Sequence, residues 1–247
     1  MTRGHILDRP LEHAWLDAAM RVGRAGLSRG EARQRLELVL RDAQLAPTAR
    51  KKTVTALGRV WIEPADAGAL MLGWAAKNLY AVPDTRPVHL AALLAAYPFF
   101  GDVCAAIGRA LALEEAVNTP ELRQRIRGTW GHRRSIDVAV QRAVKTLRGL
   151  GVLSGVPGAS TSQADARLEV PRLAAGWTVH ALMLTRGIAS IEQGAIRSAP
   201  ELFGLALPMG ELDAYPMLER HTEGGGRVVY ADVVPAEEAA PLRLFGV

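Results

Sequence analysis

Residues 121–152 read ELRQRIRGTWGHRRSIDVAVQRAVKTLRGLGV and carry the clearest structural pattern of this chain. In the second half of the stretch, apolar residues recur every three or four positions, as on the buried face of an α-helix. They are Ile136, Val140, Ala143, Val144, Leu147 and Leu150. We predict a short helix over 120–128, a turn over 128–134 whose Trp130 anchors a small core, and a second helix from its N-cap Ser135 to Leu150.

The same stretch is strongly basic. Residues 121–151 hold eight Lys and Arg side chains and two acidic ones, a net charge of +6, whereas the whole chain of 247 residues carries +5. Residues 21–59 hold ten basic and three acidic side chains, so the remainder of the chain is acidic. Basic charge of this density is typical of a surface that binds a polyanion, and nucleic acid is the first candidate.

A β-hairpin is expected after the second helix. Residues 152–156 and 166–170 are predicted as its strands, and the polar residues 157–165, which include Pro, Gly and Ser, as its loop. Two helices around a tight turn, followed by a hairpin, have the element order of a winged helix-turn-helix.

The residues before this motif are expected to be helical. Ser28 and Glu31 have the spacing of a capping box, and Thr48 is a candidate cap for the following helix. The mostly apolar residues 66–118 predict two or three further helices, with a break at 84–87. Neither of the most apolar stretches is long enough and free enough of polar groups to span a bilayer.

A domain boundary is predicted near residue 118, because Thr119 can cap a helix with Pro120 at its first position. Helices over 174–186 and 188–197 and a strand over 227–234 are expected towards the C-terminus. We therefore predict a mainly α protein. It comprises a helical domain over 1–118, a winged helix-turn-helix over 119–173 and a small α+β extension over 174–247.

Ten side chains are candidate contacts to double-stranded DNA. Six of them lie in the predicted motif. Arg133 and Arg134 would hold phosphates at the start of the second helix. Gln141, Arg142 and Lys145 would face the major groove, and Arg148 would meet the DNA backbone. The other four, from the N-terminal basic stretch, are candidate phosphate contacts: Arg50, Lys51, Lys52 and Arg59.

Each basic stretch has a second interpretation, a solvated helix face. Near residue 140 this interpretation is weakened by the scarcity of acids, because a solvated face normally pairs opposite charges four residues apart. In the N-terminal stretch both interpretations stay open, since Glu31, Glu37 and Asp42 can pair with neighbouring arginines.

Catalytic and metal-binding patterns are weak. The six histidines lack the His-Glu-x-x-His spacing of a zinc site, and the single Cys104 excludes an intramolecular disulfide or a Cys-based zinc cluster. Residues 224–227 lack the Lys-Ser/Thr of a P-loop. We expect a binding protein without catalytic residues, cofactor, metal or small-molecule substrate. The single cysteine and a charged start without an apolar leader are typical of a cytoplasmic protein.

Four short segments carry a resemblance to a known family. They are Gly26-Leu27-Ser28 with Glu31, then Ala46 to Lys52 with Thr53 and Leu57, then Leu90 to Leu94 with Pro98 and Asp102, and finally Val144 to Val152. In this order the chain resembles the BrxA family, the small DNA-binding proteins of BREX phage-defence systems. The resemblance implies an N-terminal helical domain similar to NusB, a C-terminal winged helix, DNA contacts from both, no catalytic activity, and other defence-system proteins as partners.

Two alternative functions stay open. The first is a winged-helix transcriptional regulator, in which residues 174–247 would sense a ligand or form a dimer. The second is a scaffold whose basic faces bind acidic proteins or RNA.

Overall fold

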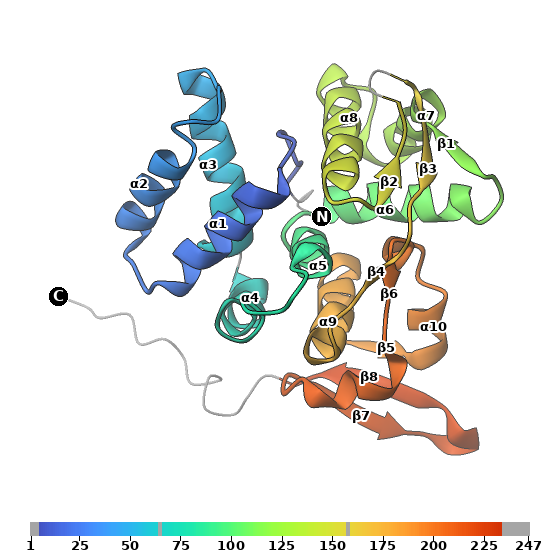
Figure 1. The fold of residues 1–247 in the computed structure, drawn as a ribbon. Helices are drawn as coiled ribbons and strands as arrows, with labels where there is room; N and C mark the ends of the chain where they lie inside the picture. Colours follow the sequence, from blue (N-terminus) through green and yellow to red (C-terminus); the bar gives the residue numbers. More distant parts are fainter. Residues whose placement is uncertain (1–4, 64–65, 157–158, 234–247) are drawn as a thin grey trace.

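The structure of the chain is a computed structural model that describes residues 5–63, 66–156 and 159–233. Ten α-helices and three small sheets are found in these residues (Figure 1). The prediction of a mainly helical chain is therefore confirmed.

Six helices form the N-terminal part. They are α1 (His13–Arg24), α2 (Arg29–Val39), α3 (Pro47–Trp61), α4 (Asp66–Asn78), α5 (Arg86–Ala96) and α6 (Pro98–Leu111). The predicted capping box at the start of α2 is confirmed, because the Ser28 N–H donates to the Glu31 carboxylate at 2.9 Å and Ser28 Oγ accepts from the Glu31 N–H. The predicted cap of the next helix is wrong. Helix α3 begins at Pro47, whose fixed φ suits the first turn, and Thr48 lies inside that turn.

Helices α5 and α6 lie in the apolar centre of the molecule. Eight of the eleven α5 residues are buried, and on α6 the buried residues include Cys104. Tyr97 joins the two helices and donates its hydroxyl to the Ala56 carbonyl of α3 at 3.0 Å. Within the described residues, no single helix is long and apolar enough to cross a membrane; α5 and α6 reach that length and composition only as a pair bent by 117°.

The next elements are β1 (Ala116–Asn118), α7 (Thr119–Trp130), α8 (Arg134–Gly149), β2 (Leu153–Ser154) and β3 (Thr161–Ala164). The three strands form an antiparallel sheet in the order β1-β3-β2. The predicted helix pair is confirmed, but α7 extends beyond residue 128 and the turn is limited to residues 131–133. The expected caps Thr119 and Ser135 are wrong, since the N-caps are Asn118 and Arg133 and both expected residues lie within the first turn of their helix.

The predicted return strand over 166–170 is also wrong. Residues 161–164 form it instead, because β1 and β2 both pair with β3, which places it at the centre of the sheet. Strand β4 (Leu168–Glu169) pairs in parallel with β6 (Leu205–Ala206). Pairing with the short β1 was not foreseen, and it joins residues on both sides of the boundary predicted near residue 118.

The C-terminal part contains α9 (Ala175–Arg186), β5 (Ser190–Glu192), α10 (Gln193–Arg197), β7 (Leu218–Thr222) and β8 (Val228–Asp232). The sheet β5-β8-β7 is antiparallel. The strand predicted over 227–234 is confirmed for residues 228–232, whereas Val234 lies outside the described residues. The helix predicted over 188–197 is confirmed only for its last five residues, because residues 190–192 pair with β8.

One hydrophobic cluster extends from Leu7 to Tyr230. Helix α9, with nine buried residues in its first three turns, packs against α5 and links the C-terminal part to this cluster. The Trp177 indole N–H donates to the Met71 carbonyl of α4 at 3.0 Å. The three segments predicted from the sequence therefore share one core.

Candidate nucleic-acid interface

Helix α8 presents one polar stripe to solvent and one apolar stripe to the core. Its predicted apolar residues, from Ile136 to Leu150, are all buried. On the opposite side, Arg134, Gln141 and Lys145 are exposed, and within the described residues they make no hydrogen bond or ion pair. Their spacings of seven and four residues place them along one face of the helix. Burial of the apolar stripe therefore fixes which side chains of α8 a partner can reach.

Two contacts fix α7, one to α6 and one to α8. Trp130, the last residue of α7, is buried with its ring edge against Phe99, and its indole N–H donates to Asp102 at 2.7 Å. Arg127 donates two hydrogen bonds to the Asp137 carboxylate of α8, and hydrogen bonding from this guanidinium lowers the pKa of Asp137. Trp130 is thus the small-core anchor that we expected, and Arg127 is neutralised within the motif.

Arg148 faces the sheet. Its Nη2 donates to the Thr161 carbonyl at 2.9 Å and to Ser162 Oγ at 2.8 Å, both on β3. The guanidinium therefore ties the end of α8 to the central strand. The prediction that Arg148 meets a DNA backbone stays a prediction, but these hydrogen bonds occupy Nη2 in the structure.

Arg142 is held by the N-terminal segment, residues 5–12, which crosses α8. Arg142 donates to the Asp8 carbonyl, and the Leu11 N–H donates to Thr146 Oγ1 at 3.0 Å. Partial burial of the guanidinium lowers the pKa of Arg142, and the positive charge of the nearby Arg9 lowers it further. The segment thus covers the edge of α8 where we expected Arg142 to face a groove of DNA.

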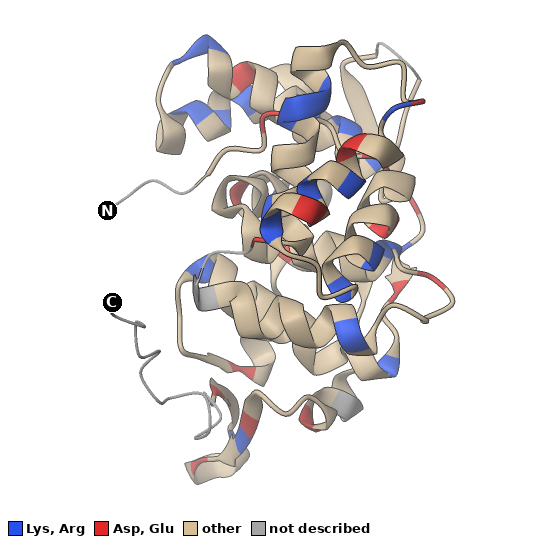
Figure 2. Ribbon diagram, turned by 90° about the vertical axis from the view of Figure 1, so that its left-hand side faces the viewer, with Lys and Arg blue, Asp and Glu red and all other residues tan. Residues whose placement is uncertain are grey.

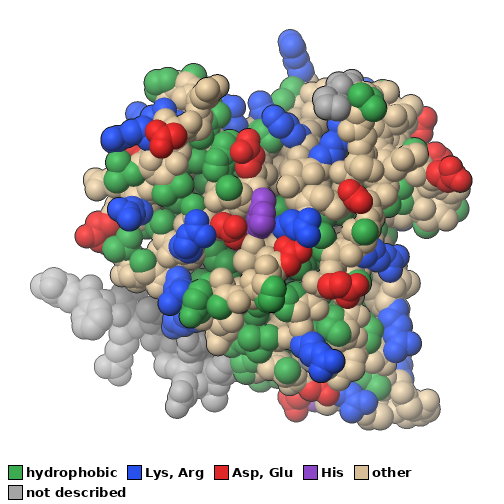
Figure 3. Space-filling view, in the orientation of Figure 1, with side chains coloured by type: hydrophobic (Ala, Val, Ile, Leu, Met, Phe, Trp, Pro, Cys, Tyr) green, Lys and Arg blue, Asp and Glu red, His purple; other side chains and the backbone are tan. Residues whose placement is uncertain are grey.

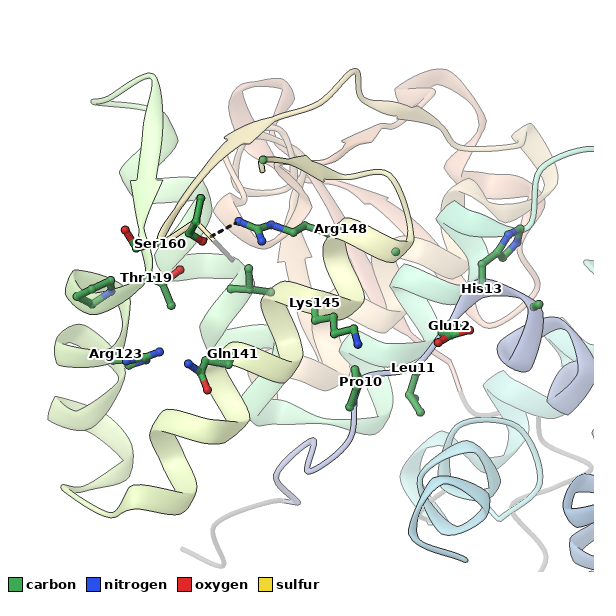
Figure 4. Close-up of a pocket in the computed structure, with 16 residues that line it drawn as sticks. Pro10, Leu11, Glu12, His13, Thr119, Arg123, Gln141, Lys145, Arg148 and Ser160 are labelled. Atoms are coloured by element: carbon green, nitrogen blue, oxygen red, sulfur yellow. Dashed lines mark hydrogen bonds between the residues drawn. The ribbon is translucent and has the colours of Figure 1, made fainter. Parts of the chain in front are cut away.

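A groove of about 1070 Å³ lies between the N-terminal segment and the helix pair. Figure 4 shows Gln141 and Lys145 reaching it from α8 and Arg123 from α7, while Arg148 extends towards residues 159–160. His13 lies on the opposite wall (Figure 4). The groove therefore combines apolar residues with cationic and polar side chains, and both come from segments far apart in the sequence.

The four N-terminal candidates differ in accessibility. Lys51 and Lys52 are exposed in the first turns of α3. Arg50 donates from Nη2 to the carbonyls of Arg41 and Leu45 at 3.3 and 3.4 Å and so holds the turn between α2 and α3. Arg59 is half-buried, with its guanidinium carbon 5.7 Å from the centre of the Tyr97 ring.

Two arginines of the N-terminal basic stretch form ion pairs with an acid other than the expected Glu31, Glu37 and Asp42. Arg29 and Arg33 both pair with Glu63, which follows α3, at 3.3 and 2.8 Å. The Glu31 carboxylate is instead bound at the capping box by the N–H and the hydroxyl of Ser28. Lys51 and Lys52 have no ion pair within the described residues.

The basic side chains are dispersed over the visible faces of the molecule. Figures 2 and 3 show Lys and Arg on several helices, with acidic residues between them. In Figure 1 the first turns of α3 and α8 lie at the same end of the molecule. The Lys and Arg side chains visible in Figure 3 are interrupted by acidic and uncharged side chains and do not form one continuous patch there.

A cluster of polar side chains, separate from the charged residues described above, joins α1 to α5. The His89 Nε2 donates to Asp17 Oδ1 at 2.9 Å, and Thr85 Oγ1 donates to the same oxygen at 2.7 Å. His13 Nε2 lies 2.8 Å from Thr85 Oγ1 and 3.5 Å from Asp17 Oδ2. The hydrogen bond from His89, then that from Thr85, lowers the pKa of Asp17 to about 2, while burial lowers the pKa of His89. A neutral His89 thus donates to an ionised Asp17.

Sequence reasoning missed this cluster. The four-residue spacing of His13 and Asp17 was a signal, but His89 lies 72 residues beyond Asp17 and shares no pattern with it.

Comparison of the chain with protein-family models gives no match, and comparison with curated proteins and with solved structures gives none either.

Proposed function

We propose that the protein binds double-stranded DNA, without catalysis, through a winged helix-turn-helix formed by α6, β1, α7, α8, β2 and β3. The observation that carries this proposal is the exposed stripe of Arg134, Gln141 and Lys145 on the second helix of the pair. The element order and the antiparallel β1-β3-β2 sheet support it, because they match those of a winged helix.

The chemistry of the stripe suits a major groove. The second helix of such a motif reads bases mainly with its N-terminal part, and Gln141 lies within the first half of α8. Gln forms paired hydrogen bonds with adenine, and Lys with guanine. Arg133, Arg134 and the free N–H groups at the helix start would hold phosphates.

Of the six candidates in the motif, Arg133, Arg134, Gln141 and Lys145 are the contacts that we favour. Arg142 and Arg148 bind the chain's own carbonyls, so their part in DNA binding would require the loss of those bonds. Lys51 and Lys52 are proposed as a separate phosphate contact. A NusB-like N-terminal domain and an accessory function in phage defence complete the proposal, and these two rest on the resemblance of four short segments. A cytoplasmic location is proposed from the single cysteine.

Fluorescence anisotropy with a labelled duplex at two salt concentrations tests the proposal. We expect saturable binding that weakens steeply with salt, as for any protein that neutralises several phosphates. The R134E/K145E variant should lose most of this affinity while its circular dichroism stays unchanged. The control K77E reverses an exposed charge on α4, and it should bind like the wild type. Absence of binding at low salt, or equal affinity of the two variants, would refute the proposal.

A second candidate function, binding of single-stranded nucleic acid, is supported by the groove. The N-terminal segment lies close to α8 and restricts the approach of a wide duplex, whereas a single strand is narrower. The separated strands of the same duplex decide between the two candidates in the same assay. Tighter binding of a single strand than of the duplex would favour the second.

A further inference from the structure

We propose that His13, Asp17 and His89 form a binding site for a divalent transition-metal ion, beside the groove. One ligand atom from each residue can be chosen so that all three lie within 4.8 Å of one another. The measured pairs are 2.9 Å from His89 Nε2 to Asp17 Oδ1 and 3.5 Å from His13 Nε2 to Asp17 Oδ2. In a tetrahedral site with zinc–nitrogen bonds of about 2.0–2.1 Å, ligand atoms lie roughly 3.3 Å apart. The two imidazole ligand atoms lie within 4.8 Å of each other, and side-chain rotations would have to bring them to the separation of such a site.

The backbone already positions the three ligands. His13 and Asp17 are one turn apart on α1, on the same face of the helix. His89 comes from α5, is fully buried, and makes T-shaped ring contacts with His13 and Trp61. Because the contact between α1 and α5 is part of the core, binding of the ion would require little ordering of the chain.

The donor set favours a transition metal over magnesium or calcium. Two imidazoles and one carboxylate suit zinc, iron, nickel or copper, whereas the harder cations prefer oxygen ligands alone. Three protein ligands leave at least one coordination position for water. His13 lines the groove, so that position would be accessible from it.

Thr85 is a positioning residue in this proposal. Its hydroxyl donates to Asp17 at 2.7 Å and would keep this bond when the ion replaces the contact between Thr85 and His13. The Nδ1 of His89 is buried and has no hydrogen-bond partner within the described residues. In tight metal sites, the ring nitrogen that does not bind the metal usually donates a hydrogen bond to a neighbouring group. Because His89 lacks such a partner in the described part of the chain, we expect micromolar affinity rather than the much tighter binding of structural zinc sites.

The alternative is a hydrogen-bonded network that only holds α1 to α5. Isothermal titration of the full chain, without a histidine tag and after dialysis against chelator, distinguishes the two. We expect one equivalent of Zn²⁺ to bind, and Co²⁺ in its place to show visible absorption bands that Zn²⁺ abolishes. Absence of stoichiometric Zn²⁺ binding would overturn the proposal.

Two variants and one control locate the ion. H13A and D17N each remove a partly exposed ligand, so both should fold, and each should weaken Zn²⁺ binding more than the roughly 10- to 100-fold that loss of an outer-shell partner costs. H132A removes an exposed histidine outside the cluster and should leave binding unchanged. Wild-type Zn²⁺ binding by D17N, in a protein with an unchanged circular dichroism spectrum, would overturn the site. No DNA is used, so the result is independent of the proposed function.

Discussion

At the scale of single residues, arginines that look alike in the sequence have different surroundings. Arg134 is exposed, Arg142 donates to the Asp8 carbonyl, and Arg148 donates to β3. The spacing of apolar residues correctly predicted which face of α8 is buried. It could not predict the surroundings of Arg142 and Arg148, because their partners lie on a segment and a strand that pack against the helix from elsewhere.

Arg148 and Lys145 should therefore respond differently to substitution. Arg148→Ala removes the partner of the Thr161 carbonyl and the Ser162 hydroxyl, and it should lower the free energy of unfolding by about 1–3 kcal/mol. Lys145→Ala should change stability by less than about 0.5 kcal/mol, as expected of an exposed side chain, and weaken DNA binding. Urea unfolding measures the difference; equal stability of the two variants would contradict this interpretation of Arg148.

Tyr97 should make the protein sensitive to alkali. Burial raises the pKa of Tyr97 from about 10 to about 12, so the unfolded chain ionises first and stability falls as the pH rises from 10 to 12. The loss should approach about 1.4 kcal/mol per pH unit. Tyr97→Phe lacks the hydrogen bond to Ala56 and should be about 1 kcal/mol less stable than the wild type at pH 8.

Comparing the wild type with the Tyr97→Phe variant isolates the effect of the Tyr97 hydroxyl, because the other tyrosines of the two proteins are the same. Unfolding measured between pH 8 and 12 should show the wild type losing its advantage and then becoming the less stable protein. A constant difference across this range would show that Tyr97 does not ionise differently in the folded and unfolded chains.

At the scale of elements, close approaches between segments decide the packing. A Cβ at Gly108 of α6 would lie 2.1 Å from the carbonyl oxygen of Pro200, where the short 3₁₀ helix Pro200–Leu202 packs on α6. A Cβ at Gly128 of α7 would meet nothing within 4 Å. The sequence shows two glycines in helices, and only the structure distinguishes the close contact from the open surface.

Alanine at these two positions should therefore have opposite effects. Gly108→Ala must separate α6 from Pro200 and should destabilise the protein by about 1–3 kcal/mol, the usual cost of overpacking. Gly128→Ala improves helix propensity at an exposed position and should stabilise it by up to about 1 kcal/mol. Thermal unfolding of both variants tests this, and similar melting temperatures would contradict it.

At the scale of the whole molecule, charge is divided between two regions. Lys51 and Lys52 lie on α3 and Arg134 and Lys145 on α8, with the N-terminal segment packed against α8. Because these side chains lie on two separate helices, we expect the two regions to act together only on a ligand long enough to reach both.

The dependence of DNA binding on salt measures this cooperation. If both regions contact one long duplex, the K51A/K52A variant should reduce the slope of log K against log salt by roughly 1.8, since each phosphate contact contributes about 0.9. On a short duplex that reaches only α8, the same variant should bind like the wild type. An unchanged slope on the long duplex would remove α3 from the interface, and K77A serves as the control.

The sequence by itself determined the helical class, the capping box at Ser28, the buried stripe of α8 and the concentration of charge. These depend on residues within a few turns of one another, whose periodicity and caps act locally. The tertiary structure alone decided that residues 161–164 form the return strand, that Arg142 and Arg148 bind the chain itself, and that His89 meets Asp17 from 72 residues away. Such contacts arise when distant segments pack into one core, and no local pattern encodes which polar groups then become neighbours.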